Sequence, residues 1–209
     1  MEVTLLGHDC FRLKGRDVTL VTDPFAPAEG SLRVGADIAT VSHDDPGHNA
    51  VAALDGGPRA VTGPGEYEIK GVLITGVGTF HDGERGKARG RNTVYLIEMD
   101  DLRICHLGDL GHTLSTEQVE EIGAVDLLFV PAGGPHTISA AQAAEVISQL
   151  EPAIVAPMDW TARDGQPTGS LEKFAHEMGI KEYEPQSRLN VNKGSLPSET
   201  QVVVLEPKR

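Results

Sequence analysis

The sequence predicts a mixed α/β (α+β) fold in which two β-sheets pack face to face and helices cover the outside, a four-layer αββα sandwich. Two patterns predict this fold. Through the first half of the chain, short β-branched runs alternate with turns rich in Gly, Pro and Asp. In the second half, helix-like segments alternate with short apolar segments that are typical of buried strands. The expected order is therefore a β-meander followed by β-α-β-α-β.

The expected strands are short and follow one another closely. They cover residues 3–6, 11–13, 18–22, 38–42, 60–62, 67–69, 72–77 with an extension to 80, 94–98, 102–106, 127–131, 154–158 and 201–205. We expect residues 1–209 to form a single domain, because this length can bury a sizeable core and no low-complexity tract divides the chain.

Helices are fewer and have clear start signals. Residues 116–122 follow Ser115, and Gln118 is placed to complete a capping box. Residues 140–150 follow Ser139, with Gln142 in the same role. A further helix is expected over residues 171–178, and the run 49–54 is also helix-like.

The charge balance limits the classes of partner. A net charge of −13 argues against nucleic-acid binding and against adhesion to anionic membranes, since both need a basic surface. No apolar run is long enough to span a bilayer, and the N-terminal residues lack the pattern of a signal peptide. The two cysteines, Cys10 and Cys105, indicate buried thiols rather than a disulfide framework. We therefore expect a cytoplasmic protein.

The segment VSHDDPGHNAV, residues 41–51, concentrates ligand-type side chains between an expected strand and a helix-like run. His43 and Asp45 are two residues apart in an extended turn, a spacing that can direct both side chains toward one point. His48 follows shortly after. Histidine and aspartate are common ligands for zinc and for harder divalent ions. The segment therefore indicates either a metal site or a polar turn in which Asp44 or Asp45 caps a helix.

Further ligand-type residues lie at the ends of other expected strands. His81 follows the strand that begins at residue 72, Asp109 follows the strand 102–106, and Asp159 ends the strand 154–158. Strand ends project their loops to one rim of a sheet, where binding sites commonly lie. Several strand ends that supply His or Asp to one rim are a stronger indication of a metal site than any single segment.

The loop after His81 concentrates Arg85, Lys87, Arg89 and Arg91 in an otherwise acidic chain. One interpretation is that Arg89 and Arg91 capture a carboxylate or phosphate of the substrate beside the metal. The other is a solvated, mobile loop. His136 follows a Gly-rich turn and is a further candidate for a substrate contact.

Five separated motifs occur in an informative order. They are LLGHDCFRLKG with VTLVTDPF, then VSHDDPGHN, then GPGEYEIKGVLITGV with TFHD, then CHLGDLGH, and last the segment that runs from VDLLFVPAGG to PMDW. Together they resemble the metallo-β-lactamase-fold hydrolases, and within that superfamily the branch that includes L-ascorbate-6-phosphate lactonase. The resemblance extends over nearly the whole chain and implies the αββα sandwich.

The resemblance also implies two metal positions bridged by Asp109. The two ligand sets are His43, Asp45 and His81, and His48, Asp109 and Asp159. The motif is altered, because Asp45 and Asp159 stand where the family has histidine, and Gly47 stands where it has aspartate. In this sense the motif is degenerate relative to the family pattern.

Carboxylates are harder ligands than imidazole, so these changes favour manganese, iron or magnesium over zinc. We expect either one divalent metal ion (Mn, Fe or Zn) or a site that holds none tightly. The occupied position would use His43, His48, His81 and Asp109, supported by Asp45 and Asp159.

The resemblance implies a metal-dependent hydrolase that attacks a small, anionic ester, lactone or phosphoester with a metal-activated water, with Asp109 and Asp45 as catalytic residues. The alternative is a pseudoenzyme of the same fold that serves as a ligand-binding or assembly module. The altered residues favour the pseudoenzyme, and the retained histidines favour the hydrolase. The resemblance is also compatible with a homo-oligomer.

Overall fold

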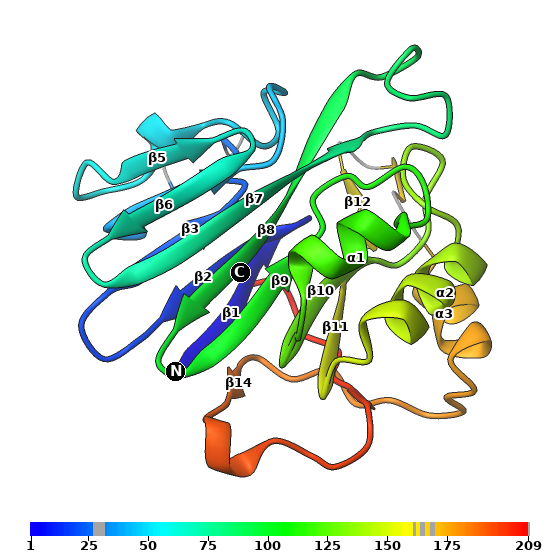
Figure 1. Cartoon of the computed structure of the whole chain (residues 1–209). Helices are drawn as coiled ribbons and strands as arrows, with labels where there is room; N and C mark the ends of the chain where they lie inside the picture. Colours follow the sequence, from blue (N-terminus) through cyan, green and yellow to red (C-terminus); the bar gives the residue numbers. More distant parts are fainter. Residues whose placement is uncertain (27–31, 161, 164–165, 168–169, 209) are drawn as a thin grey trace.

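Two β-sheets form the body of the molecule (Figure 1). The computed structural model describes residues 1–26, 32–160, 162–163, 166–167 and 170–208. One sheet has six strands in the order β14-β1-β2-β3-β4-β5. Their bounds are β1 Glu2–Gly7, β2 Cys10–Lys14, β3 Thr19–Thr22, β4 Ile38–Val41, β5 Arg59–Thr62 and β14 Leu189–Asn190.

The other sheet has seven strands in the order β15-β11-β10-β9-β8-β7-β6. The strands from β6 to β9 pair antiparallel, whereas β9, β10, β11 and β15 pair parallel. A separate hairpin pairs β12 Ala162–Arg163 with β13 Gln166–Pro167. The bounds of the seven strands are β6 Gly65–Ile69, β7 Val72–Phe80, β8 Arg91–Met99, β9 Leu102–His106, β10 Leu127–Pro131, β11 Ile154–Met158 and β15 Gln201–Val202.

Helices α1 (Thr116–Ile122), α2 (Ala140–Leu150) and α3 (Leu171–Glu177) lie on the outer side of the seven-stranded sheet (Figure 1). Both predicted capping boxes are present, at Ser115 with Gln118 and at Ser139 with Gln142. Short 3-10 turns, η1 and η2, cover Val51–Ala53 and Lys193–Ser195. The predicted mixed α/β sandwich is therefore confirmed.

The space between the two sheets is filled by apolar side chains from both. Phe11 of β2 stacks on Phe129 of β10, with ring centroids 3.9 Å apart, and both side chains are fully buried. The hydroxyl group of Tyr95 in β8 reaches across the space between the two sheets. It donates a hydrogen bond to the Val41 carbonyl at 2.8 Å and accepts one from the Gly63 amide at 2.9 Å. These contacts fix the end of β4 against the second sheet.

The outer face of the six-stranded sheet is covered without an α-helix in the described part of the chain. Strand residues that alternate with the inward-facing ones, such as Val21 and Ala39, pack with Val34, Leu54 and Val51. The predicted helix-like run 49–54 is reduced to the 3-10 turn η1, so that expectation was wrong in type and length. The amide of Ala50 donates to the Pro24 carbonyl at 2.8 Å, which ties the start of this run to another segment.

Candidate metal centre

The carboxyl ends of five strands carry ligand-type residues to one edge of the sandwich. Asp23 follows β3, His43 follows β4, His81 follows β7, Asp109 follows β9 and Asp159 follows β11. Strands β3 and β4 run parallel in one sheet, and β9, β10 and β11 run parallel in the other, so their loops emerge together. The predicted rim of ligand-type residues is present.

Three imidazoles surround the carboxylate of Asp109. Its Oδ2 atom lies 3.2 Å from Nε2 of His81, 3.6 Å from Nε2 of His48 and 3.7 Å from Nε2 of His43. The ring centroids of His43 and His48 are 4.3 Å apart, and those of His43 and His81 are 4.9 Å apart. Three imidazole nitrogens and one carboxylate form a donor set that binds zinc, iron and related divalent ions.

A second layer of carboxylates orients His48. Its Nδ1 atom lies 2.6 Å from Oδ2 of Asp9 and 3.5 Å from Oδ2 of Asp23, and all three side chains are buried. The Nδ1 atom therefore carries a proton, and Nε2 faces Asp109. A carboxylate behind a histidine ligand fixes its tautomer and raises its basicity. Nε2 of His106 lies 2.9 Å from the Asp9 carbonyl and donates to it, which holds the Asp9 turn in place.

His43 is oriented in a similar way through a hydroxyl group. Ser42 Oγ donates to the carboxylate of Asp23, and the Ser42 amide donates to the same carboxylate at 2.7 Å. The Ser42 oxygen can then accept the Nδ1 proton of His43, which lies 2.9 Å away. His43 consequently presents an unprotonated Nε2 toward Asp109, the form that binds a metal ion.

Asn92 of β8 holds the Asp109 loop. Its Oδ1 atom accepts the Asp109 amide at 3.0 Å, and its Nδ2 atom donates to the Leu107 carbonyl at 2.9 Å and to Thr79 Oγ1 at 2.8 Å. Gly108 lies between these contacts with φ +55°, and a Cβ atom there would approach Asn92 Oδ1 to 2.5 Å. A glycine at this position allows the loop to pack close enough to receive the Asn92 contacts.

The electrostatics of the cluster follow from burial and from proximity. Burial raises the pKa of Asp109, but hydrogen bonding to His81 and the nearby charges of His48 and His43 outweigh it and hold the pKa well below its usual range. Burial lowers the pKa of His48, yet Asp9 and its neighbouring carboxylates raise it to about 12. At His43 burial dominates and lowers the pKa. The cluster thus combines an anionic Asp109 with a His48 that holds its proton strongly and a His43 that favours the neutral form.

A cavity of about 270 Å³ opens beside the cluster. Two of the predicted substrate-binding residues, Arg89 and His136, line it together with predicted metal-site residues. Arg91 does not, and lines an adjacent groove instead. The metal-site residues in the cavity wall are His43, Asp45, His81, Asp109 and Asp159.

Asp45 and Asp159 lie beside the three-histidine cluster rather than within it. Neither belongs to the sets of ligand atoms that converge within 4.8 Å among the described residues. The Gly47 amide donates to Asp45 Oδ1 at 2.8 Å, so Asp45 also stabilises its own turn. Asp159 has a left-handed backbone with φ 53°, and its amide donates to the His8 carbonyl at 3.0 Å.

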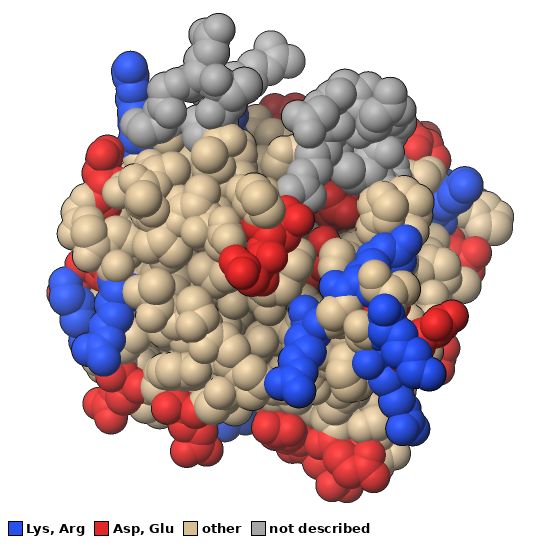
Figure 2. Space-filling view, turned by 90° about the horizontal axis from the view of Figure 1, so that it is seen from above, with Lys and Arg blue, Asp and Glu red and all other residues tan. Residues whose placement is uncertain are grey.

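The basic loop after His81 is organised by Asp82. Its carboxylate accepts the backbone amides of residues 84, 86, 88 and 89 at distances between 2.7 and 3.0 Å. The Arg89 guanidinium donates to the Pro135 carbonyl at 3.2 Å. Figure 2 views the edge of the molecule that is uppermost in Figure 1, and Lys and Arg side chains gather on one part of it. The loop therefore presents positive charge from a defined turn.

Sequence reasoning did not single out Asp9, Asp23 or Asp82. Asp9 stands between His8 and Cys10 in LLGHDCF, and Asp23 precedes Pro24 in VTLVTDPF. Both motifs supported the family resemblance, but the contacts with His48 join residues 25 to 39 positions apart in the chain. The available signal was an aspartate next to an expected strand, inside a motif that resembles the family.

Comparisons with known proteins identify the superfamily of the chain. A family model described as a beta-lactamase superfamily domain matches residues 2–159. The chain belongs to this superfamily. A crystal structure from Thermotoga maritima, of a metallo-β-lactamase-superfamily protein provisionally assigned as a Zn-dependent hydrolase, superposes with a TM-score of 0.82. The two are 37% identical, and the match covers 98% of this chain and 97% of that chain.

Two curated relatives of this superfamily member are UPF0173 metal-dependent hydrolases. The protein from Thermococcus onnurineus is 28% identical, over 77% of this chain and 84% of its own length. The protein from Methanospirillum hungatei is 26% identical, over 78% of this chain and 84% of its own length. These two relatives are described as metal-dependent hydrolases, and this chain shares their superfamily.

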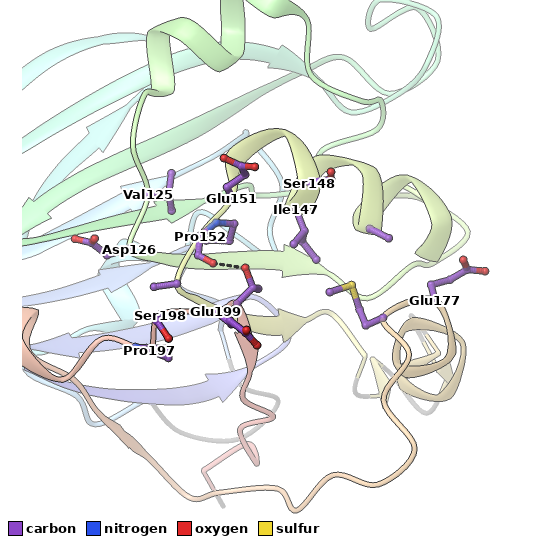
Figure 3. Close-up of a pocket in the computed structure, with 14 residues that line it drawn as sticks. Val125, Asp126, Ile147, Ser148, Glu151, Pro152, Glu177, Pro197, Ser198 and Glu199 are labelled. Atoms are coloured by element: carbon purple, nitrogen blue, oxygen red, sulfur yellow. Dashed lines mark hydrogen bonds between the residues drawn. The ribbon is translucent and has the colours of Figure 1, made fainter.

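A larger cavity of about 810 Å³ lies at the opposite ends of β10 and β11 (Figure 3). It is lined by residues that precede these strands, such as Asp126 and Pro152, and by the segment 197–200. Thr200 Oγ1 donates to the Pro152 carbonyl across it at 2.7 Å. This cavity is remote from the histidine cluster.

In the part of the chain that the structure describes, none of the helices has the length and apolar character needed to cross a membrane.

Proposed function

We propose that this chain hydrolyses a small ester, lactone or phosphoester with the help of one divalent ion. The ion would be held by His43, His48, His81 and Asp109. The observation that carries the proposal is the convergence of three Nε2 atoms on one buried carboxylate oxygen, at 3.2 to 3.7 Å. The donor set fits a divalent ion, because the tautomers of two of the histidines are set by groups behind them.

When bound, such an ion lowers the pKa of water and polarises a carbonyl or phosphoryl oxygen. We assign Asp109 to holding the ion and Asp45, in the wall of the same cavity, to accepting the proton of the attacking water. Arg89 and His136 line that cavity and would contact an anionic group of the substrate. This assignment makes the substrate a small, negatively charged molecule.

Two opposing features of the site bear on the identity of the ion. Three imidazoles suit zinc and iron, whereas the carboxylates of Asp45 and Asp159 beside the cluster suit harder ions such as manganese. We therefore propose Mn²⁺, Fe²⁺ or Zn²⁺ as the bound ion. We also propose that the chain is related to the lactonase-like branch of the superfamily. We further propose a cytoplasmic, single-domain protein.

The pseudoenzyme alternative is not favoured. A decayed site would be expected to lose its convergent geometry. Here the retained histidines keep their carboxylate and hydroxyl supports, and the replaced positions, Asp45 and Asp159, still line the cavity. The altered motif is therefore better described as a retuned site with the same position in the fold.

A hydrolysis screen tests the proposal. Protein purified without chelator is assayed against 4-nitrophenyl esters, γ- and δ-lactones and 4-nitrophenyl phosphate, with Mn²⁺, Fe²⁺ or Zn²⁺ added singly. We expect turnover of at least one substrate that EDTA abolishes and one of these ions restores. The variant His81→Ala should lose this turnover, and His176→Ala, on the exposed face of α3, should keep it. If the wild type hydrolyses none of these substrates, with or without an added ion, the proposal is contradicted.

A further inference from the structure

A second groove adjoins the metal-site cavity and shares two residues with it. The groove has a volume of about 690 Å³, and its wall includes His43 and Arg89, which also line the smaller cavity. Beyond these two residues, it is lined by Arg91 at the start of β8 and by the corner at Gly63 and Pro64. The two compartments therefore adjoin at His43 and Arg89.

The far wall of the groove is a fixed corner. The Gly63 amide donates to the Tyr95 hydroxyl at 2.9 Å, and the Gly63 carbonyl accepts from the Tyr67 hydroxyl at 3.1 Å. The corner packs closely on β7, because a Cβ atom at Gly76 would lie 2.6 Å from the Gly63 carbonyl oxygen. A wall held at both its amide and its carbonyl is pre-formed, which is typical of ligand sites.

The near wall is tied to the metal-binding turn. The Thr93 amide donates to the Ser42 carbonyl at 2.8 Å, one residue before His43. This bond sets the start of β8, which carries Arg91, at a defined position relative to the cluster. The groove and the metal-site cavity are thus parts of one framework.

The charged groups around the groove favour an anion. Arg89 and Arg91 line it, and among the ion pairs of the described residues neither arginine takes part. Asp44 is the acidic residue in the described wall, and it accepts a hydrogen bond from Asn49 Nδ2 at 2.7 Å. A guanidinium offers paired donors that match a carboxylate or phosphate. Pro64, which is exposed, adds apolar surface for a carbon chain or ring.

We propose that this groove is a second subsite, which binds the part of the substrate remote from the scissile bond. Its ligand is a carbon chain or ring that ends in a carboxylate or phosphate, with Arg91 as the residue that recognises the terminal anion. Arg89 stands between the two compartments. The inference rests on the proposed hydrolase function for its biological meaning, but the subsite can be tested by binding alone.

Dicarboxylates of increasing length measure the span between the two compartments. Binding of succinate, glutarate, adipate and suberate to the metal-loaded protein is followed by isothermal titration calorimetry. We expect the affinity to peak at one chain length, because one carboxylate then reaches the metal-site cavity while the other meets Arg91. In Arg91→Gln the peak should weaken about tenfold, the typical loss for one charge-assisted hydrogen bond. The same series with one carboxylate replaced by a phosphonate separates carboxylate from phosphate preference.

Arg85→Gln is the matched control. Arg85 belongs to the same loop and carries the same charge, but it is absent from the described lining of both compartments. Its dicarboxylate profile should equal that of the wild type. A profile without a length optimum, or an equal loss in both variants, would overturn the subsite.

Hydrolysis separates this inference from the proposed function. The selectivity for mono(4-nitrophenyl) glutarate over 4-nitrophenyl butyrate should fall about tenfold in Arg91→Gln and persist in Arg85→Gln. If neither ester is hydrolysed but dicarboxylate binding depends on Arg91, the subsite stands and the proposed ester hydrolysis fails. If both esters are hydrolysed with unchanged selectivity in Arg91→Gln, the hydrolase stands and the subsite fails.

Discussion

The amide of Asp109 donates a hydrogen bond to Oδ1 of Asn92 at 3.0 Å, so one buried amide side chain positions the central carboxylate of the metal cluster. The same Asn92 donates to the Leu107 carbonyl and to Thr79 Oγ1. It therefore connects the ends of β7, β8 and β9 at the point where His81 and Asp109 emerge. Its polar atoms are satisfied by backbone and side-chain partners, as a buried amide requires.

Replacing Asn92 with leucine should weaken both the fold and the metal site. We expect a loss of about 1–3 kcal/mol in the free energy of unfolding, because the Asp109 amide and the Leu107 carbonyl lose a buried partner. Metal affinity should fall as well, since the Asp109 loop is no longer held. Chemical denaturation and metal titration measure the two effects. Wild-type metal affinity in this variant would show that Asn92 does not position Asp109.

Asp9→Asn tests the carboxylate behind His48. The amide can still contact Nδ1 but no longer supplies a negative charge, so we expect metal affinity to drop about 10–100-fold. Competition with a chromophoric chelator gives the affinity. Asp17→Asn, an exposed change of the same kind, serves as the control and should bind metal like the wild type. A metal affinity in Asp9→Asn equal to that of the wild type would show that Asp9 does not support the metal site.

Gly108→Ala should destabilise the fold, although it adds only one methyl group. Gly108 has φ +55°, and the new Cβ would lie 2.5 Å from both Asn92 Oδ1 and Ser42 Cβ. We expect a loss of about 1–3 kcal/mol from backbone strain and crowding. Gly57→Ala is a useful comparison, because Gly57 has a similar φ of +60° but open space around its Cβ position. Thermal unfolding that ranks Gly57→Ala as the more damaging change would contradict the close approach at Gly108.

The turn around Asp82 should depend on pH in one direction. Burial raises the pKa of Asp82, but four backbone amides outweigh it and lower the pKa to about 2. A carboxyl whose folded pKa is depressed stabilises the turn above its unfolded pKa of about 3.9, and this stabilisation is lost as the pH falls through about 2. Amide NMR shifts of residues 84, 86, 88 and 89 should move together in that window. Asp82→Asn should abolish the transition, and its persistence would assign it to another group.

Much of the fold could be predicted from local sequence. The strands Leu127–Pro131 and Ile154–Met158 were predicted with their observed bounds, because continuous apolar runs of this length suit buried parallel strands. The helices after Ser115 and Ser139 were likewise predicted from their capping boxes. In these segments, local preference and tertiary packing agree.

Other features depend on distant contacts and could not be predicted in the same way. The run 49–54 became the 3-10 turn η1 because the Ala50 amide bonds to Pro24, and its apolar residues pack on the outer sheet face. The two-residue strand β14 exists only by pairing with β1. In the candidate site, the rim of His43, His81 and Asp109 was predicted from strand ends. The supporting roles of Asp9 and Asp23 were not, because they arise from packing between separate loops.

Metal content tests the central claim most directly. Protein purified without chelator is analysed by inductively coupled plasma mass spectrometry, with His81→Ala and His176→Ala prepared in parallel. Our account predicts about one Mn, Fe or Zn ion per chain in the wild type and in His176→Ala, and a large loss in His81→Ala, because three imidazoles and one carboxylate are the proposed donor set. A wild type that binds no ion even after metal addition, or an His81→Ala variant that retains its full metal content, would contradict it.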